Sequence, residues 1–158
     1  MKTKAARTHP AQAKPLQRAP VRLLVCDDQR FVRTLVRQML RQIHAVEIVG
    51  EADGGKSVVS LAHELRPDVV LMDVSMPDLD GIEATRQIVL RSPATRILAH
   101  SSDLSPQRVE SMMAAGAHGF LLKTGDPNEL MTAVATVLAG ERFVSARTAG
   151  PQLKHRRD

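Results

Sequence analysis

Short apolar runs alternate with amphipathic segments along most of the chain, and the alternation occurs five times between residues 21 and 145. Runs that are apolar nearly throughout are typical of strands covered on both faces, as in a parallel sheet. We predict five such strands, at Leu23–Cys26, Val46–Glu51, Val69–Met72, Arg96–His100 and Gly119–Leu122.

The segments after the strands carry apolar residues three and four positions apart, which is the period of a helix. The first helix has Val32, Leu35, Val36, Met39 and Ile43, and the fifth has Leu130, Ala133, Val134, Val137 and Leu138. Capping residues support these positions. We expect Asp80, paired with Glu83, to cap the third helix, Ser105 the fourth and Asp126 the fifth, and Gly140 to end the fifth.

Five β-α units predict an α/β fold with a doubly wound, five-stranded parallel sheet. Ligands of such sheets bind in the crevice beyond the carboxyl ends of the strands. Candidate chemistry is therefore sought just after each predicted strand.

The two ends of the chain differ from the middle. Residues 1–20 mix Lys, Arg, Ala and Gln with three prolines and show no apolar period, so we predict a disordered basic tail there, a domain at 21–145 and a second basic tail at 146–158. The net charge of +5 comes from these tails, because residues 23–146 hold sixteen acidic and twelve basic residues. We interpret the tails as solvated; salt-sensitive binding to an acidic partner, nucleic acid or membrane is the alternative.

Composition excludes several classes. No apolar run approaches the ~20 residues of a membrane-spanning helix, and residues 1–20 lack the apolar segment of a signal peptide. The single cysteine, Cys26, excludes an internal disulfide and favours a cytoplasmic protein. We expect Cys26 itself to be a small buried residue of the first strand. Tyr and Trp are absent, which disfavours nucleic-acid surfaces built on stacked aromatics.

Polar residues follow four of the predicted strands directly: Asp27 and Asp28, then Asp73, Ser101 and Lys123. Neighbouring carboxylates repel one another, and a divalent cation removes that conflict. Mg²⁺ prefers oxygen ligands and keeps several waters. We predict a site for Mg²⁺ (or Mn²⁺) at Asp28 and Asp73, with the main-chain carbonyl of Ser75 as a further ligand.

Four segments carry a family resemblance: LLVCDDQRFVRTLVRQML, RPDVVLMDVSMPDLDGIEATRQI, ILAHSS and AAGAHGFLLK. In this order they resemble the receiver domain of two-component response regulators. The resemblance covers about residues 21–145 and is greatest to the NarL-type branch. It implies the flavodoxin-like strand order 2-1-3-4-5 of CheY-like domains.

The resemblance also implies roles for individual residues. Asp73 is the phosphoacceptor, which takes the group from a phosphohistidine on a sensor histidine kinase or phosphotransfer protein. Asp28 is a metal ligand, and Asp27 holds a metal-bound water. Lys123 contacts the phosphoryl oxygens and Ser101 donates a hydrogen bond to them. Phe120 matches the aromatic switch position that turns inward when the hydroxyl moves.

Three residues depart from the family pattern. His100 stands where an apolar residue is usual, and we favour a packed core histidine over a pH sensor. Ser75 lacks the longer side chain often found two residues after the phosphoacceptor, which leaves the rate of autodephosphorylation open. Thr124 stands after Lys123, where many receiver domains have a proline preceded by a cis peptide bond. A cis bond before threonine is costly, so we expect the conformation of this loop to differ from that of those domains.

Together these features predict a single-domain response regulator that signals to an unidentified output protein by a conformational switch. It is expected to be a phosphoacceptor that assists its own phosphorylation and dephosphorylation rather than an enzyme. Homodimerisation through the fourth helix and fifth strand, or through the first and fifth helices, is left open. The alternatives are a phosphorylation-independent interaction module, a receiver fragment of a DNA-binding regulator, and nucleic-acid binding by the tails. A flavin site is disfavoured because two acids, not a phosphate-binding loop, follow the first strand.

Overall fold

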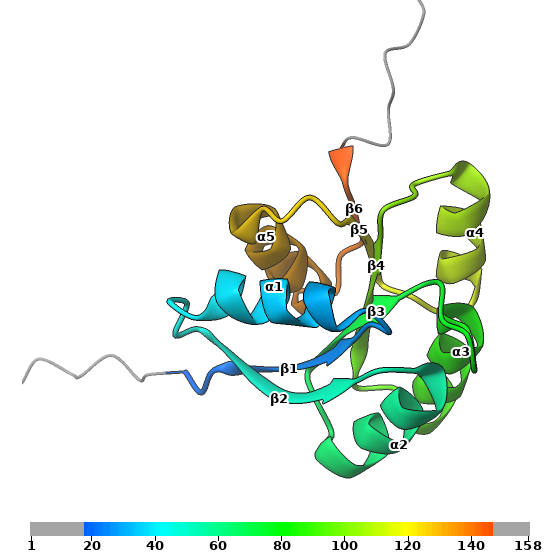
Figure 1. Ribbon diagram of the computed structural model, residues 1–158, viewed down its shortest axis with the longest axis horizontal. Helices are drawn as coiled ribbons and strands as arrows, with labels where there is room; N and C mark the ends of the chain where they lie inside the picture. The colour runs from blue at the N-terminus through cyan, green and yellow to red at the C-terminus, as the bar shows by residue number, and fades with distance from the viewer. Residues whose placement is uncertain (1–17, 147–158) are drawn as a thin grey trace, which may run out of the picture.

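The computed structural model describes residues 18–146, which form one parallel sheet between two layers of helices (Figure 1). Strands and helices alternate along the chain as β1 Val21–Cys26, α1 Arg30–Leu40, β2 Val46–Ala52, α2 Gly55–Leu65, β3 Val69–Asp73, α3 Gly81–Arg91, β4 Arg96–Ser101, α4 Pro106–Ala114, β5 Gly119–Leu122, α5 Pro127–Leu138 and β6 Phe143–Val144. The predicted tails lie outside the described residues, apart from the exposed residues 18–20 and residue 146. None of the helices in this part of the chain is long and apolar enough to cross a membrane.

The strand order is β2-β1-β3-β4-β5-β6, and every neighbouring pair is parallel. The predicted doubly wound sheet and its order 2-1-3-4-5 are therefore confirmed. The prediction of five strands was one short, because β6 adds an edge strand in which Phe143 pairs with Gly119 and Val144 with Phe120. A strand of two residues is too short to show an alternating pattern in the sequence.

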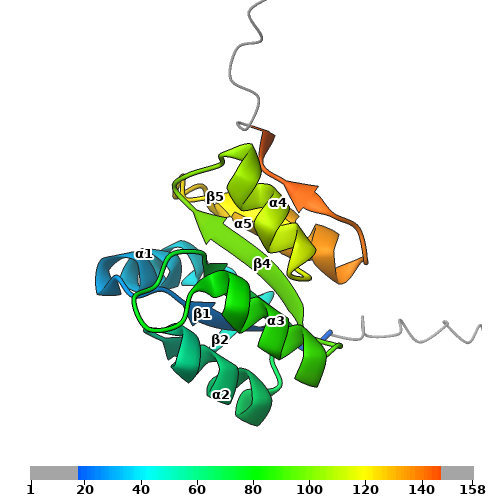
Figure 2. The ribbon, with the colours of Figure 1, turned by 90° about the vertical axis from the view of Figure 1, so that its right-hand side faces the viewer.

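Each face of the sheet has its own apolar core. Helices α1 and α5 cover one face, and α2, α3 and α4 cover the other (Figures 1 and 2). Successive strand residues point to opposite faces, so Leu23 and Val25 join the first core while Leu24 and Cys26 join the second. Burial on both faces explains why β1 and β3 read as continuous apolar runs.

Two of the three predicted N-cap residues make a capping hydrogen bond through their side chains. The Asp80 carboxylate accepts a hydrogen bond from the Glu83 amide at 2.8 Å, and Asp126 accepts one from the Asn128 amide at 2.9 Å. Gly140 follows α5 with a positive φ of 84°, as its predicted role requires. The Glu83 side chain does not return to the cap; it accepts hydrogen bonds from Arg86 and Gln87 further along the helix.

Ser105 occupies the N-cap position of α4, as predicted, but its side chain makes no capping hydrogen bond. Instead the Ser105 amide donates to the carboxylate of Asp103 at 2.8 Å, a local turn in which an aspartate side chain bonds the backbone two residues on. Pro106 still opens the helix with its fixed backbone angle.

Candidate functional site

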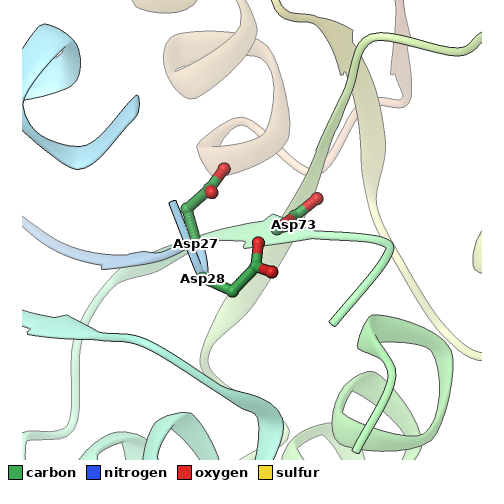
Figure 3. A group of neighbouring side chains, drawn as sticks. All are labelled: Asp27, Asp28 and Asp73. Carbon is green, nitrogen blue, oxygen red and sulfur yellow. The ribbon is translucent and has the colours of Figure 1, made fainter. Parts of the chain in front are cut away.

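Three carboxylates gather at the carboxyl edge of the sheet. Asp27 and Asp28 follow β1, and Asp73 is the last residue of the neighbouring strand β3. Cys26 at the end of β1 pairs with Met72 of β3, so Asp27 and Asp73 come next on adjacent strands. One oxygen from each of the three carboxylates lies within 4.8 Å of the others (Figure 3). Asp27 and Asp73 are buried and Asp28 is exposed, so the cluster has one side open to solvent.

The ammonium of Lys123 lies against this cluster. Its Nζ is 2.7 Å from Oδ2 of Asp27 and 3.2 Å from Oδ1 of Asp73. Burial alone lowers the pKa of Lys123, but its hydrogen bonds and attraction to Asp27 and Asp73 outweigh burial and raise it. Lys123 is therefore a cation in the site and offsets part of the negative charge of the two buried acids.

Asp73 has an unusual protonation equilibrium. Burial raises its pKa to about 6; the positive charge of Lys123 opposes this rise, and the charge of Asp27 adds to it. The Ser75 amide lies 3.4 Å from Oδ1 of Asp73 and also favours the ionised form. At neutral pH the carboxylate is largely ionised and poorly solvated, which are the properties of a nucleophile or a metal ligand.

The donor set fits a hard divalent cation. The oxygens come from three carboxylates, the ligands that Mg²⁺ and Mn²⁺ take in preference to nitrogen or sulfur. The exposed side of Asp28 leaves room for the waters that Mg²⁺ retains. Ser75 borders the same space, and its main-chain carbonyl as a ligand stays a prediction.

The predicted hydroxyl and amine face the same cavity. A hollow of about 190 Å³ is lined by Asp28, Gln29, Asp73, Ser75, Ser101, Ser102, Asp103, Arg108 and Lys123. Ser101 ends β4 and is buried, and its Oγ accepts a hydrogen bond from the Asp103 amide at 3.1 Å. The structure thus brings together Asp73, Ser101 and Lys123 from three strand ends.

Two residues of this cavity were not anticipated from the sequence. Arg108 reaches the cavity from α4 and Asp103 from the loop before it, and both lie outside the motifs at the strand ends. Arg108 is one of 22 Lys and Arg residues in the chain, so its residue type alone carried no signal.

Phe120 and His100 are both buried. Phe120 has no exposed surface and packs in the core under α2, α3 and α4. Burial lowers the pKa of His100 to about 3, and the nearby charge of Lys123 contributes. His100 is thus a neutral, packed residue, in agreement with the interpretation that we favoured.

Cys26 is buried, its Sγ lies 3.3 Å from Sδ of Met76, and burial together with the charge of Asp73 raises its pKa, so it is a poor thiolate nucleophile. The peptide bond before Thr124 is trans, as are all others in residues 18–146.

The sequence model of the response regulator receiver domain matches residues 23–135. The chain belongs to this family, whose members act in two-component signalling. Among curated proteins, it is 39% identical over 132 residues to the response regulator GacA of Pseudomonas aeruginosa, covering 82% of this chain and 60% of GacA. The chain thus spans about three fifths of the length of this relative.

Solved structures agree with the family. A two-component response regulator of the LuxR family from Aurantimonas is 33% identical, with a TM-score of 0.77, over 82% of this chain and 92% of that chain. The isolated receiver domain of RcsB from Salmonella enterica serovar Typhimurium is 26% identical, with a TM-score of 0.73, over 83% of this chain and 99% of that chain; it was solved in the presence of the phosphomimetic BeF₃⁻.

Proposed function

We propose that this domain accepts a phosphoryl group on Asp73 from a phosphohistidine of a sensor histidine kinase or phosphotransfer protein, and signals to a protein partner by changing shape. The observation that carries the proposal is the meeting of Asp73 with Lys123, Ser101 and two further carboxylates around one small cavity. An acidic cluster alone would be weak support, since carboxylates also gather at loops without function. An ammonium between two buried acids and a hydroxyl opposite them make the arrangement specific.

Asp73 supplies the attacking oxygen. Its Oδ1 is engaged by Lys123 and by the Ser75 amide, so we assign the attack to Oδ2. A bond forms between Oδ2 and phosphorus while the bond from phosphorus to the donor imidazole breaks, and its electron pair stays on the imidazole. Lys123 turns from the carboxylates toward a phosphoryl oxygen and stabilises the charge that accumulates there.

Asp28, Asp73 and the Ser75 carbonyl would hold a Mg²⁺ or Mn²⁺ ion, with Asp27 beside them. A bound ion supplies positive charge that offsets the charge of the transferring phosphoryl group. Asp27 already bonds Lys123 through Oδ2 and accepts the Gln29 amide through Oδ1 at 2.8 Å, so it is held in place before any ligand arrives.

The switch begins at Ser101. Phosphorylation adds roughly −1.5 to −2 charges and three acceptor oxygens next to this hydroxyl. A hydrogen bond from Ser101 to the phosphoryl group draws the β4–α4 loop toward Asp73, and Lys123 draws the β5–α5 loop. Phe120 lies on β5 with a buried side chain, and we assign it the role of the aromatic switch residue.

The wider role is also a proposal. We place the protein in the cytoplasm, as a phosphoacceptor that assists its own phosphorylation and dephosphorylation, with an output partner still to be identified. A homodimer, through α4 and β5 or through α1 and α5, is one form that output can take.

The test is phosphorylation by acetyl phosphate with Mg²⁺, followed by intact-mass spectrometry. We expect a gain of one phosphoryl group in the wild type and none in Asp73→Asn. Asp53→Asn, which changes an exposed carboxylate after β2, is the matched control and should label normally. No labelling of the wild type, or labelling that persists in Asp73→Asn, would favour the phosphorylation-independent interaction module.

A further inference from the structure

Arg108 joins the two loops that border the phosphorylation cavity. From the first turn of α4, its Nη1 donates to Oγ of Ser75 at 2.5 Å, and its Nε lies 3.0 Å from Oδ2 of Asp103. Ser75 belongs to the β3–α3 loop and Asp103 to the β4–α4 loop. The planar guanidinium of Arg108 therefore links two loops that are far apart in the sequence.

Each partner of Arg108 is bonded in turn to a residue of the proposed reaction. The Ser75 amide lies 3.4 Å from Oδ1 of Asp73, and the Asp103 amide donates to Oγ of Ser101 at 3.1 Å. The guanidinium thus holds the position of both loops relative to Asp73 and Ser101. We call the set Ser75, Arg108 and Asp103 the guanidinium bridge.

The guanidinium bridge also borders two cavities. Arg108 and Ser75 line the 190 Å³ hollow that contains Asp73, and both also line a hollow of about 450 Å³ between α3 and α4. The larger hollow is also bordered by Asp80, Gln107 and Ser111. The Arg108 side chain is 38% exposed, while the carboxylate of Asp73 is buried.

We propose that Arg108 is a positioning residue that ties the β3–α3 and β4–α4 loops together beside Asp73, limits the access of water between them and so prolongs the life of the phosphoryl group on Asp73. This inference rests on the proposed function. In hydrolysis, a water oxygen forms a bond to phosphorus on the side opposite Asp73. The bond from phosphorus to the Asp73 oxygen breaks, its electron pair returns to the carboxylate, and the proton lost by water leaves with inorganic phosphate. The three residues of the guanidinium bridge line the same cavity as Asp73, so the loops that they tie together border the space through which water must come.

A surface ion pair of arginine is ordinarily worth little, and the pair of Arg86 with Glu83 on α3 at 3.0 Å is an example in this protein. Arg108 differs because its two partners lie on different loops and because a charge-assisted hydrogen bond to Ser75 adds to the ion pair with Asp103. Lysine offers a point charge and cannot span both partners in one plane. Arg108→Lys should therefore behave more like Arg108→Ala than like the wild type.

The experiment measures the decay of the phosphorylated protein. Wild type, Arg108→Ala, Arg108→Lys, Ser75→Ala and the Ser75→Ala/Arg108→Ala double variant are labelled with acetyl phosphate and Mg²⁺, freed of donor by rapid desalting, and followed by intact mass. We expect Arg108→Ala to lose phosphate about threefold to tenfold faster, with Ser75→Ala showing part of that effect. The double variant should decay no faster than Arg108→Ala, because both changes open the same bridge. Arg86→Ala, the matched control, should decay as the wild type does.

Two further readouts distinguish positioning from general loosening. The rate of labelling should stay within about twofold of the wild type in Arg108→Ala, since the attack by Asp73 does not use the bridge. The thermal midpoint should be close to that of Arg86→Ala, since both changes remove an exposed ion pair.

Unchanged or slower decay in Arg108→Ala, with normal labelling, would overturn the inference and leave the proposed function intact. Effects of Ser75→Ala and Arg108→Ala that simply add would overturn it as well. Failure of the wild type to become labelled would overturn both.

Discussion

The ammonium of Lys123 lies 3.2 Å from the carboxylate of Asp73, although 50 positions separate the two residues in the sequence. The same ammonium is 2.7 Å from Asp27. The site therefore holds a cation of its own between its two buried acids. Under the proposed function, a phosphoryl group that arrives at Asp73 meets an ammonium that needs only to change its acceptor.

Lys123→Met tests this relationship, since methionine keeps an unbranched apolar stem and removes the charge. We expect labelling by acetyl phosphate to slow about ten- to a hundredfold, as on loss of a preorganised donor to developing charge. Without the ammonium the two carboxylates repel, so added Mg²⁺ should raise the thermal midpoint more than it does in the wild type. Lys56→Met, an exposed change at the start of α2, is the control. Equal labelling rates in wild type and Lys123→Met would exclude this role.

Metal binding is tested through stability. A ligand that binds only the folded state stabilises it, and about 10 mM Mg²⁺ with a Kd of about 1 mM would add about 1.4 kcal/mol. For a domain of this size, that raises the thermal midpoint by about 4 °C. Asp28→Asn keeps the shape of the side chain and weakens it as a ligand, so the rise should be largely lost. An equal rise in Asp28→Asn, measured at constant ionic strength, would place the metal elsewhere.

The convergence of Asp27, Asp28 and Asp73 could be predicted from the sequence because parallel strands end at one edge of a sheet. Continuous apolar runs identified those strands, and polar residues that follow such a run must sit at that edge. The strand ends were displaced by one residue at Asp73 and Ser101, which belong to β3 and β4. A one-residue change at a strand end does not move a side chain away from the edge.

Arg108, Ser105 and β6 show what the pattern does not contain. Arg108 reaches the site through the length of its side chain from a helix, and periodicity gives no sign of that reach. At Ser105 the helix starts as predicted, but the amide bonds Asp103 and the side chain makes no capping bond, which the residue type alone does not reveal. Strand β6 depends on partners far away in the sequence: the Ser145 amide donates to the Phe120 carbonyl at 3.0 Å, and Oγ of Ser145 accepts from the Leu122 amide at 2.9 Å.

Gly81→Ala tests how closely α3 approaches the backbone of Asp73. A Cβ on Gly81 would lie 2.1 Å from the carbonyl oxygen of Asp73, and the amide of Gly81 donates to the Val74 carbonyl at 2.9 Å. The backbone at Asp73 would have to shift, so we expect a loss of about 3 kcal/mol in the free energy of unfolding and slower labelling. Gly125→Ala is the comparison: its φ is positive, but a Cβ there meets nothing within 4 Å, so it should cost about 1 kcal/mol. If denaturant titrations gave the same loss of free energy of unfolding for Gly81→Ala and Gly125→Ala, α3 would not pack tightly against the backbone of Asp73.

His100 should make the protein less stable in mild acid. Its pKa is lowered from 6.5 to about 3 by burial and by Lys123, so the unfolded chain binds a proton there below pH 6.5 while the folded protein does not. Stability from the neutral form is present above the unfolded pKa and is lost as the pH falls. From pH 7 to pH 5 the loss is about 2 kcal/mol.

His100→Leu removes this titration and isolates it. Asp73, whose pKa is raised to about 6, acts in the opposite sense in the same range, because its folded form binds the extra proton there. The free energy of unfolding of either protein alone contains the contribution of Asp73. The difference in this free energy between His100→Leu and the wild type therefore reports on His100. Urea titrations at pH 7, 6 and 5 should show this difference growing in favour of His100→Leu by about 2 kcal/mol. A difference that stays constant across the three pH values would mean that His100 takes up a proton in the folded protein as readily as in the unfolded chain.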